Sequence, residues 1–254
     1  MLYKNKEWLE NKYLNEKLSK VKIAKICNVS RFAIRYHMKK MNIPIRSISE
    51  AHSLARGNHC NLTVEAKQWL NGELLGDGCL VSYSKYSASF AYTSKYLEYI
   101  QYVSDTLKSF GIMQSAEIRE AIGKQGNVYY QYHSLNYPEL LKIKEIFYIN
   151  NKKIIPKNID FTPLTLRQWY IGDGGLVYRM SKNNKPQLNI VLYTYGFTKE
   201  EVKNIIKKLI NMGFGATQQL SRNIIGISRK STKDFLEFIG ECPVQCYQYK
   251  WGIK

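Results

Sequence analysis

The sequence lacks several features that would assign it to other classes of protein. No run of apolar residues approaches the ~18 that a membrane-spanning helix needs. The N-terminal segment MLYKNKEWLENKYLNEK is charged throughout, so it has no apolar core of a signal peptide. The five cysteines, at positions 27, 60, 79, 242 and 246, are an odd number and do not indicate a disulfide framework. These absences predict a cytoplasmic, intracellular protein with reduced thiols and no membrane partner.

Motifs for structural zinc and for nucleotide hydrolysis are also lacking. Cys242 and Cys246 are poorly spaced for zinc, and no histidine follows His133. The two histidines and the cysteine within 52–60 are too scattered to form a site. No glycine-rich loop ends in Lys-Ser or Lys-Thr. The sequence therefore favours neither a zinc module nor a P-loop ATPase.

Acidic residues are scarce. The chain of 254 residues has 20 acidic against 38 basic residues, a formal net charge of +18. Such an excess favours a polyanionic partner, and nucleic acid is the common one inside cells. Residues 1–56 hold 13 Lys and Arg against 4 Glu, a net 13 − 4 = +9, which is half of the total charge. This asymmetry predicts two modules, 1–56 and 57–254, each with its own anionic surface to bind.

The first module is expected to be helical. Residues 5–18 predict one helix with Trp8, Leu9, Tyr13 and Leu14 on a single stripe. Residues 19–41 predict two short helices around a tight turn. The inner face of this pair is expected to consist of Ile23, Ala24 and Ile26 on the first helix and Ile34, Met38 and Met41 on the second.

The pattern I-A-x-I-x-N-V-S, followed by a basic helix, resembles the helix-turn-helix family. Ser30 is a plausible N-cap, and Asn28 stands where the family often has Gly, because Asn also tolerates the left-handed conformation. The residues expected to point away from the core are Arg31, Phe32, Arg35, Tyr36 and Lys39. The resemblance implies that Arg31, Arg35 and Lys39 contact DNA, while a merely solvated basic helix is the alternative. The polar stretch 46–61 is expected to be a linker.

The rest of the chain divides into two halves, about 63–150 and 163–254, with the same order of elements. The first half predicts helices over 63–76, 95–109 and 137–148 and strands over 79–93 (two strands), 114–120 and 127–134. The second predicts helices over 163–172, 198–211 and 231–239 and strands over 175–194 (two strands), 216–222 and 224–229. In both halves the first strand pair closes on Tyr-Thr, and a glycine, Gly111 or Gly213, caps the middle helix. Each half is therefore an α-β-β-α-β-β-α repeat.

A Gly-Asp-Gly sequence ends the first helix of each half. The halves share Leu-x5-Gly-Asp-Gly-x-Leu-Val, and the two acids, Asp77 and Asp173, lie 173 − 77 = 96 residues apart. Flanking glycines allow two helix ends to approach backbone to backbone, which would set both carboxylates at one seam. Such carboxylates repel each other unless a cation lies between them, so the pattern favours a divalent metal. Two metals ~4 Å apart are a common device for hydrolysing phosphodiesters.

LNGELLGDG (70–78) and LRQWYIGDG (166–174) resemble the two motifs of the single-chain LAGLIDADG homing endonucleases. The resemblance covers about residues 63–254 and implies an α+β fold. In that fold a pseudo-two-fold pair of repeats forms two antiparallel saddle sheets, here preceded by a small all-α helix-turn-helix domain. The sequence departs from the family pattern at two positions. Gln168 stands where the first copy has the small Gly72, and Glu73, at a usually apolar position, is expected to pair locally.

The resemblance implies a site-specific double-strand DNA endonuclease that uses Mg²⁺ or Mn²⁺, with Ca²⁺ binding but not supporting cleavage. Asp77 and Asp173 would bind the metal, joined by Gly76 and Gly172. Family members that cleave also place a lysine near each half-site. Lys153 lies 153 − 77 = 76 residues after the first acid and Lys250 lies 250 − 173 = 77 after the second, with Lys152 as the alternative for the first. Such a lysine would stabilise charge on the phosphate or tune the attacking water.

DNA contacts are expected from alternate residues of the strands after each acid, in the major groove of double-stranded DNA. With Leu80 and Leu176 inward, the alternation predicts that Val81, Tyr83, Lys85, Val177, Arg179, Ser181 and Asn183 face DNA, with Arg119 and Arg222 extending these faces. Since one chain carries both motifs, we expect a monomer on an asymmetric target, with no protein partner. A transcription regulator with an inactive LAGLIDADG-like domain and an RNA maturase remain the rival functions.

Overall fold

The computed structural model describes residues 1–48, 50–51, 57–180 and 186–252. The chain forms two compact units, Met1–Asn58 and His59–Lys254. Over the described residues, no helix combines the length and the apolar character needed to cross a membrane.

The described elements of the first unit are helical. They are η1 (Leu2–Lys4), α1 (Lys6–Glu10), the π-helical turn η2 (Asn11–Asn15), α2 (Lys20–Ile26) and α3 (Arg31–Lys40). Their core consists of Tyr3, Leu9, Tyr13, Ile23, Ala24, Ile34, Met38 and Ile43. The unit therefore has a small hydrophobic core of its own.

The turn between α2 and α3 forms as the sequence predicts. Asn28 is left-handed with φ 50°, and Ser30 accepts a hydrogen bond from the Ala33 N–H at 3.2 Å. Two other expectations are wrong. The single helix over 5–18 is interrupted by η2, whose wider turn leaves Leu14 39% exposed beside the buried Tyr13. Ile26, the last residue of α2, is 53% exposed and does not join the inner face.

The second unit has the predicted pair of repeats. The first half consists of α5 (Val64–Leu75), β1 (Cys79–Val81), β2 (Ser89–Ser94), α6 (Leu97–Ser109), β3 (Arg119–Ile122), β4 (Val128–His133) and α7 (Pro138–Phe147), followed by the ribbon β5 (Tyr148–Ile149) and β6 (Lys152–Lys153). The second half consists of α8 (Pro163–Asp173), β7 (Gly174–Met180), β8 (Pro186–Tyr193), α9 (Lys199–Asn211), β9 (Ala216–Gln219), β10 (Ile224–Ile227), α10 (Arg229–Ile239) and the 3-10 helix η3 (Gln245–Trp251).

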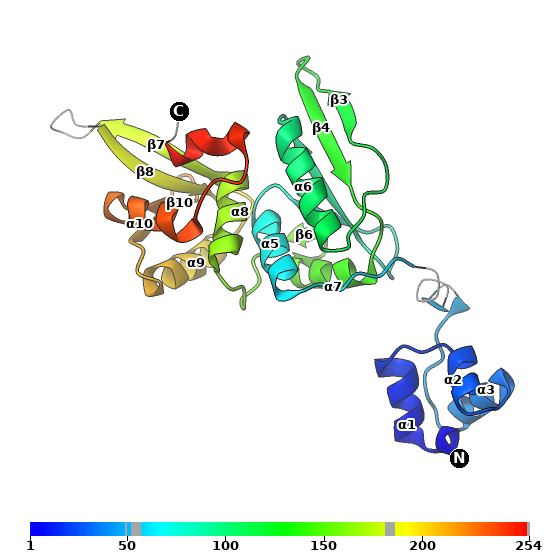
Figure 1. Cartoon of the computed structure of the whole chain (residues 1–254). Helices are drawn as coiled ribbons and strands as arrows, with labels where there is room; N and C mark the ends of the chain where they lie inside the picture. Colours follow the sequence, from blue (N-terminus) through cyan, green and yellow to red (C-terminus); the bar gives the residue numbers. More distant parts are fainter. Residues whose placement is uncertain (49, 52–56, 181–185, 253–254) are drawn as a thin grey trace. The chain divides into compact units, whose positions relative to one another are not determined.

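Each half has one four-stranded antiparallel sheet. The strand orders are β1-β2-β4-β3 and β7-β8-β10-β9, so corresponding strands take corresponding places. Helices α6 and α7 pack on the first sheet, and α9 and α10 pack on the second (Figure 1). The predicted α+β fold is confirmed. The sequence placed the strands too broadly, since β1 ends at Val81 and β3 begins only at Arg119.

Helices α5 and α8 pack side by side between the two sheets (Figure 1). Their packing is asymmetric, as the unequal motifs predict. A Cβ atom at Gly72 would lie 2.6 Å from the Cβ of Gln168 and would also collide with the carbonyl oxygen of Thr165. Gln168 is fully buried, and its amide donates a 2.8 Å hydrogen bond to the Tyr102 hydroxyl. The absent side chain of Gly72 therefore makes room for the larger residue of the second motif.

Candidate active site

The C-terminal ends of α5 and α8 meet backbone to backbone. A Cβ atom at Gly172 would lie 3.3 Å from the Cα of Gly76 and 3.2 Å from the main-chain nitrogen of Asp77. Glycine at both positions allows this approach, because any side chain would push the helix ends apart. The acid that follows each glycine, Asp77 or Asp173, is thus held at the seam of the two halves.

The glycines after the acids are also required by packing. A Cβ atom at Gly78 would lie 2.8 Å from the carbonyl oxygen of Glu73 and 3.0 Å from the Phe90 ring. The N–H of Gly78 donates to the same carbonyl at 2.9 Å and closes the end of α5. At Gly174, an added Cβ would collide with Tyr170. Each Gly-Asp-Gly therefore ends a helix and turns the chain directly into the first strand of its sheet.

The two carboxylates affect each other electrostatically. Burial, and next the charge of Asp77, raise the pKa of Asp173 to about 7, against the opposing effect of Lys153 and Lys250. The Tyr92 hydroxyl donates a 3.4 Å hydrogen bond to Oδ2 of Asp77. Close like charges in a partly buried place favour a bound cation.

One lysine lies at the end of each motif helix. Lys153 Nζ donates to the carbonyl oxygens of Gly76 at 3.0 Å and Gly78 at 2.7 Å. Lys250 Nζ donates to those of Ile171 at 2.5 Å and Gly172 at 3.2 Å. The two lysines thus occupy matching places beside the acids. Lys152, the alternative for the first site, is exposed on β6.

Burial is the main influence on the acidity of both ammonium groups. It lowers the pKa of Lys153, while nearby acids, including Asp173 and Asp77, oppose the shift. It lowers the pKa of Lys250 to about 8, again against Asp77 and Asp173. Lys250 is only 7% exposed. At neutral pH its side chain is therefore close to the point at which it can exchange a proton.

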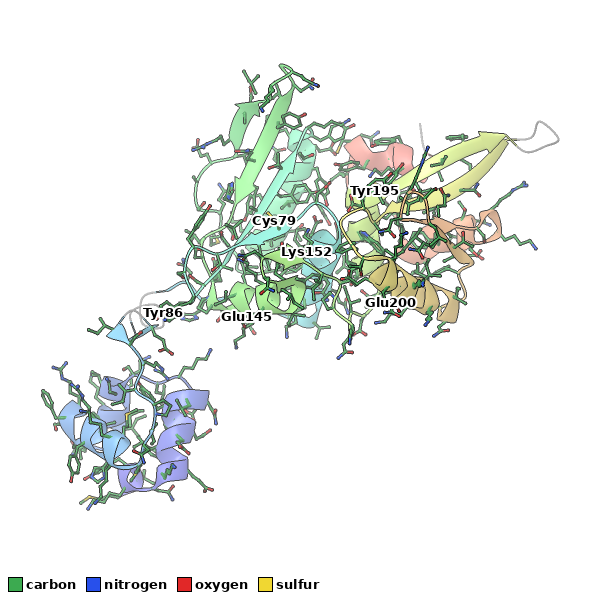
Figure 2. All side chains as sticks on the ribbon, turned by 180° about the vertical axis from the view of Figure 1, so that it is seen from behind. Cys79, Tyr86, Glu145, Lys152, Tyr195 and Glu200 are labelled. Atoms are coloured by element: carbon green, nitrogen blue, oxygen red, sulfur yellow. The ribbon has the colours of Figure 1, made fainter. Side chains whose placement is uncertain are left out.

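A cavity of about 320 Å³ opens beside the first lysine. Its lining consists of Leu75, Gly76, Lys153, Asp173, Tyr193, Tyr195, Gly196 and Phe197. Figure 2 labels Lys152, next to Lys153 on β6, in the region between Cys79 of the first half and Tyr195 of the second. The cavity therefore joins Asp173 of one half to the lysine of the other.

The donor atoms at the seam suit a hard cation. In the part of the chain that the structure describes, no cluster of three His, Cys, Asp or Glu side chains could hold a metal ion. Asp77 and Asp173 supply carboxylate oxygens, and the nearby carbonyl groups keep a second lone pair beside the lysine hydrogen bond. An all-oxygen set of this kind fits Mg²⁺ or Mn²⁺ and not Zn²⁺.

Glu73 is a third acidic group close to the seam, but it pairs locally, as the sequence suggested. It is 1% exposed, and the Tyr99 hydroxyl donates a 2.6 Å hydrogen bond to its Oε1. Burial raises the pKa of Glu73 to about 8, with the Tyr99 hydrogen bond opposing the shift. At neutral pH its carboxyl is therefore mostly protonated and adds little negative charge beside Asp77.

The outward face of the first sheet carries polar and aromatic side chains. Leu80 is buried against the core, so its neighbour Val81 points outward, as predicted. Arg119 on β3 pairs with Gln131 on β4, which pairs with Thr93 on β2, and all three therefore share one face. Gln131 was missed, because the alternation was followed only along the strands next to the acids. In the second sheet, Val177 of β7 pairs with Asn189 of β8.

Several predicted contact residues are not on strands. Tyr83 and Lys85 are exposed but follow the end of β1, so the alternation that placed them on a strand is wrong. Arg222 lies in the turn between β9 and β10. Arg179 lies on β7, paired with Gln187. Ser181 and Asn183 lie outside the described residues.

In the first unit, α3 has the predicted division of faces. Ile34 and Met38 are fully buried. The exposed residues on the same helix include Arg31, Phe32, Arg35, Tyr36 and Lys39. This helix therefore presents a basic and aromatic surface to solvent.

Comparison with known proteins identifies the second unit. The sequence profile of the LAGLIDADG DNA endonuclease family matches residues 67–235. The chain is 26% identical over 152 residues to an uncharacterized protein of Methanocaldococcus jannaschii, covering 59% of this chain and 57% of that protein. It is 26% identical over 157 residues to the cytochrome b mRNA maturase bI2 of Debaryomyces hansenii, covering 58% of this chain and 56% of the maturase. The chain thus spans a little over half the length of these relatives.

The fold is similar to that of the homing endonuclease I-WcaI, solved bound to its DNA recognition sequence. The TM-score is 0.65 with 22% sequence identity, and the match covers 84% of this chain and 96% of that chain. At this level of identity the likeness concerns the fold. The family profile matches both motifs and most of the two repeats. The chain therefore belongs to the LAGLIDADG DNA endonuclease family, in its single-chain form with two motifs.

Proposed function

We propose that this protein is a site-specific homing endonuclease that cuts both strands of a long, asymmetric DNA target. The observation that carries the proposal is the contact of two helix ends at Gly76 and Gly172, which brings Asp77 and Asp173 to one seam. A pure DNA-binding regulator has no need for paired carboxylates with a lysine beside each. This combination is what phosphodiester hydrolysis requires.

Asp77 and Asp173, with the main chain at Gly76 and Gly172, would hold Mg²⁺ or Mn²⁺. Burial, and next the charge of Asp77, raise the pKa of Asp173, and a bound cation would offset both by stabilising the charged carboxylate. The bound ion would supply positive charge at the scissile phosphates and make a coordinated water more acidic. Ca²⁺ would occupy the same oxygens without supporting cleavage.

Lys153 and Lys250 would act on the two phosphates from opposite sides of the seam. Each ammonium group is fixed by hydrogen bonds to carbonyl oxygens at the end of its motif helix. A fixed positive charge there stabilises negative charge developing on a phosphate. Because the pKa of Lys250 is about 8, its Nζ can also take up or release a proton near neutral pH.

The outward faces of the two sheets would lie in the major groove. Arg119 and Gln131, with Thr93 on the same face, form a row suited to hydrogen bonds with base edges. The further DNA contacts that we propose are Tyr83, Lys85, Arg179, Ser181, Asn183 and Arg222. Basic residues away from the sheet face would contact phosphates and set the register.

The first unit would be a helix-turn-helix module that adds a second contact with DNA. Its basic helix α3 exposes Arg31, Arg35 and Lys39, while its opposite face holds the core of the unit. A helix of this kind fits the major groove. We therefore propose that the protein binds its target as a monomer through two separate surfaces.

Cleavage of a selected target tests the proposal. DNA bound by the protein in Ca²⁺ would be selected from a random library, end-labelled on each strand, and incubated with protein in Mg²⁺. We expect one cut in each strand, no cut in EDTA, and binding without cutting in Ca²⁺. DNA that is bound tightly but never cut in Mg²⁺ or Mn²⁺ would contradict the endonuclease assignment.

A second candidate function is RNA maturation, which the similarity to a cytochrome b mRNA maturase favours. A maturase would bind a folded intron RNA and speed its splicing. The two functions are separated by competition, because an endonuclease binds its duplex target in the presence of excess structured RNA. If a cognate intron RNA displaces the duplex from the protein, the maturase is favoured.

A further inference from the structure

Two glutamates reach across the seam between the halves. Glu98 is the second residue of α6, in the first half. Its two carboxylate oxygens accept the main-chain N–H groups of Gln245 at 2.6 Å and Cys246 at 3.0 Å. These two residues begin η3, the short helix of the second half that carries Lys250. A carboxylate of the first half therefore holds the segment of the second lysine.

Glu201 makes the reciprocal contact. It is the third residue of α9, in the second half, and its Oε1 accepts the N–H of Ile155 at 2.8 Å. Ile155 follows Lys153 by two residues. The other oxygen of Glu201 accepts the N–H of Thr198 at 2.7 Å and its hydroxyl at 2.6 Å, so the carboxylate is oriented by the cap of its own helix. A carboxylate of the second half therefore holds the segment of the first lysine.

The two contacts are alike in kind but do not involve equivalent residues, because Glu98 is the second residue of its helix and Glu201 is the third. Glu98 binds residues that precede Lys250, and Glu201 binds a residue that follows Lys153. Helices α6 and α9 are the middle helices of their halves, and both glutamates lie in the first turn. The Glu98 contact is reinforced by aromatic packing, since Tyr247 of η3 lies edge-on to Tyr96 and Tyr99, with ring centroids 5.2 and 5.0 Å apart. Each contact therefore joins the first turn of one half's middle helix to the segment that carries the other half's lysine.

The Lys153 segment is held from both halves. Lys153 pairs with Tyr148 on its β5 side, and the N–H of Ile154 donates to Phe147 at 2.8 Å. Glu201 therefore holds this ribbon from the opposite half. Hydrogen bonds between N–H groups and a carboxylate are about twice as strong as neutral ones. A displacement of ~1 Å at a catalytic group can lower a rate about 100-fold.

We propose that Glu98 and Glu201 are positioning residues that act crosswise. Glu98 sets Lys250 at the end of α8, and Glu201 sets Lys153 at the end of α5, so each half positions the lysine of the other half. The inference rests on the proposed endonuclease function. If it is right, the two halves must be docked correctly before either strand can be cut. The Lys153 segment has an additional hold, because Lys208 Nζ donates to the carbonyl oxygens of Lys157 at 2.9 Å and Ile159 at 2.8 Å.

The first test measures the lysines without DNA or metal. Trace acetylation of the folded protein, followed by mass spectrometry, gives the relative reactivity of each ε-amino group. Glu98→Ala should raise the labelling of Lys250 about 10-fold and leave Lys153 unchanged, since it frees only the second segment. Glu201→Ala should raise the labelling of Lys153, by a smaller factor because Lys208 still holds the segment. The same fold-change relative to wild type at both lysines in either variant, including no change at either, overturns the proposal.

Matched variants separate this role from general loss of structure. Glu98→Gln and Glu201→Gln keep one acceptor oxygen and place an NH₂ group against the second N–H, so they should restore only part of the wild-type labelling. Asp105→Asn on α6 is an exposed control. Glu200→Gln, which removes a surface ion pair with Lys203 at 3.9 Å, is the control on α9. Both controls should match the wild type in labelling, cleavage and melting temperature. A control variant that raises the labelling of the lysine in the opposite half overturns the assignment.

The second test measures cleavage of each strand separately. Lys250→Met and Lys153→Met first identify the strand that each lysine serves. Glu98→Ala should slow the Lys250 strand between about 10- and 100-fold and leave the other strand within about 2-fold, and Glu201→Ala should slow the Lys153 strand. Equal slowing of both strands indicates a structural role and overturns the proposal. If the wild type cuts no DNA, the endonuclease assignment fails, and the labelling alone then decides the positioning role in either direction.

Discussion

Tyr99 of α6 donates a 2.6 Å hydrogen bond to Glu73 of α5, and both side chains are buried. Burial raises the pKa of Glu73 from its ordinary 4.5 to about 8, so the folded protein holds this proton more tightly than the unfolded chain does. A group of this kind contributes less to stability as the pH rises between these two values. The stability of the wild type should therefore decline between about pH 4.5 and pH 8 through Glu73.

Glu73→Gln should remove this decline, because glutamine accepts the Tyr99 hydrogen bond and carries no charge. At pH 9 we expect the variant to be more stable than the wild type by roughly 1–3 kcal/mol, which is a rise of several degrees in Tm. At pH 4 the two proteins should melt within about a degree of each other. Thermal melts across this range check the prediction, and a constant difference at all pH values would contradict it.

Gly72→Ala should destabilise the second unit by about 1–3 kcal/mol, because the new methyl group would collide with Gln168 and Thr165 across the helix interface. Gln168→Gly in the same protein should recover part of the loss, since it removes the closer side chain. Gly196→Ala is the control, because nothing lies within 4 Å of the added Cβ. Denaturant unfolding measures all three, and a Gly72 variant as stable as the Gly196 variant would show that the interface tolerates the methyl group.

The first unit should contribute phosphate contacts. Arg31→Ala with Arg35→Ala should weaken DNA binding and shorten the footprint, with the cleavage rate at saturating protein unchanged. Each lost phosphate contact should reduce the slope of log K against log salt by about 0.9. Footprinting and a salt titration of affinity provide the measurement. The same footprint and slope in the double variant would mean that α3 contacts something other than this DNA.

The target should be asymmetric and the bound protein a monomer. The two reading faces differ at equivalent places, since Val81 of β1 pairs with Ser89 whereas Val177 of β7 pairs with Asn189. Unlike side chains favour unlike base edges, so the two half-sites should differ in sequence. Library selection gives the target, and sedimentation gives the mass of the complex. A perfect palindrome, or a complex with two chains, would contradict this expectation.

The sequence was most informative where it repeats. The sequence repeats the Gly-Asp-Gly motif, and each acid is followed by a lysine at a matching separation. These groups lie together in the structure, because the equivalent helix ends of a duplicated fold meet at the pseudo-two-fold axis. The hydrogen bonds that Glu98 and Glu201 accept from the opposite half could not be predicted. Each bonds a main-chain N–H far away in the sequence, and such contacts depend on how the halves dock. Neither residue belongs to a motif.

Local detail was also beyond the sequence. The π-helical turn at Asn11–Asn15 keeps the helical pattern of apolar residues while it changes the face that Leu14 occupies. The alternation after Asp77 continued in the sequence to Lys85, although β1 ends at Val81. Periodicity indicates which type of element a segment forms, and tertiary contacts decide where the element stops.

Asp77 and Asp173 are proposed to make the catalytic centre together. Cleavage of selected target DNA in Mg²⁺ by Asp77→Asn and Asp173→Asn, with binding measured in parallel, tests this role. Each substitution removes a carboxylate from the metal site but few contacts with the duplex. We therefore expect loss of double-strand cleavage by at least about 1,000-fold, with the dissociation constant in Ca²⁺-free buffer within a few-fold of wild type. Cleavage at the wild-type rate by either variant would contradict the account.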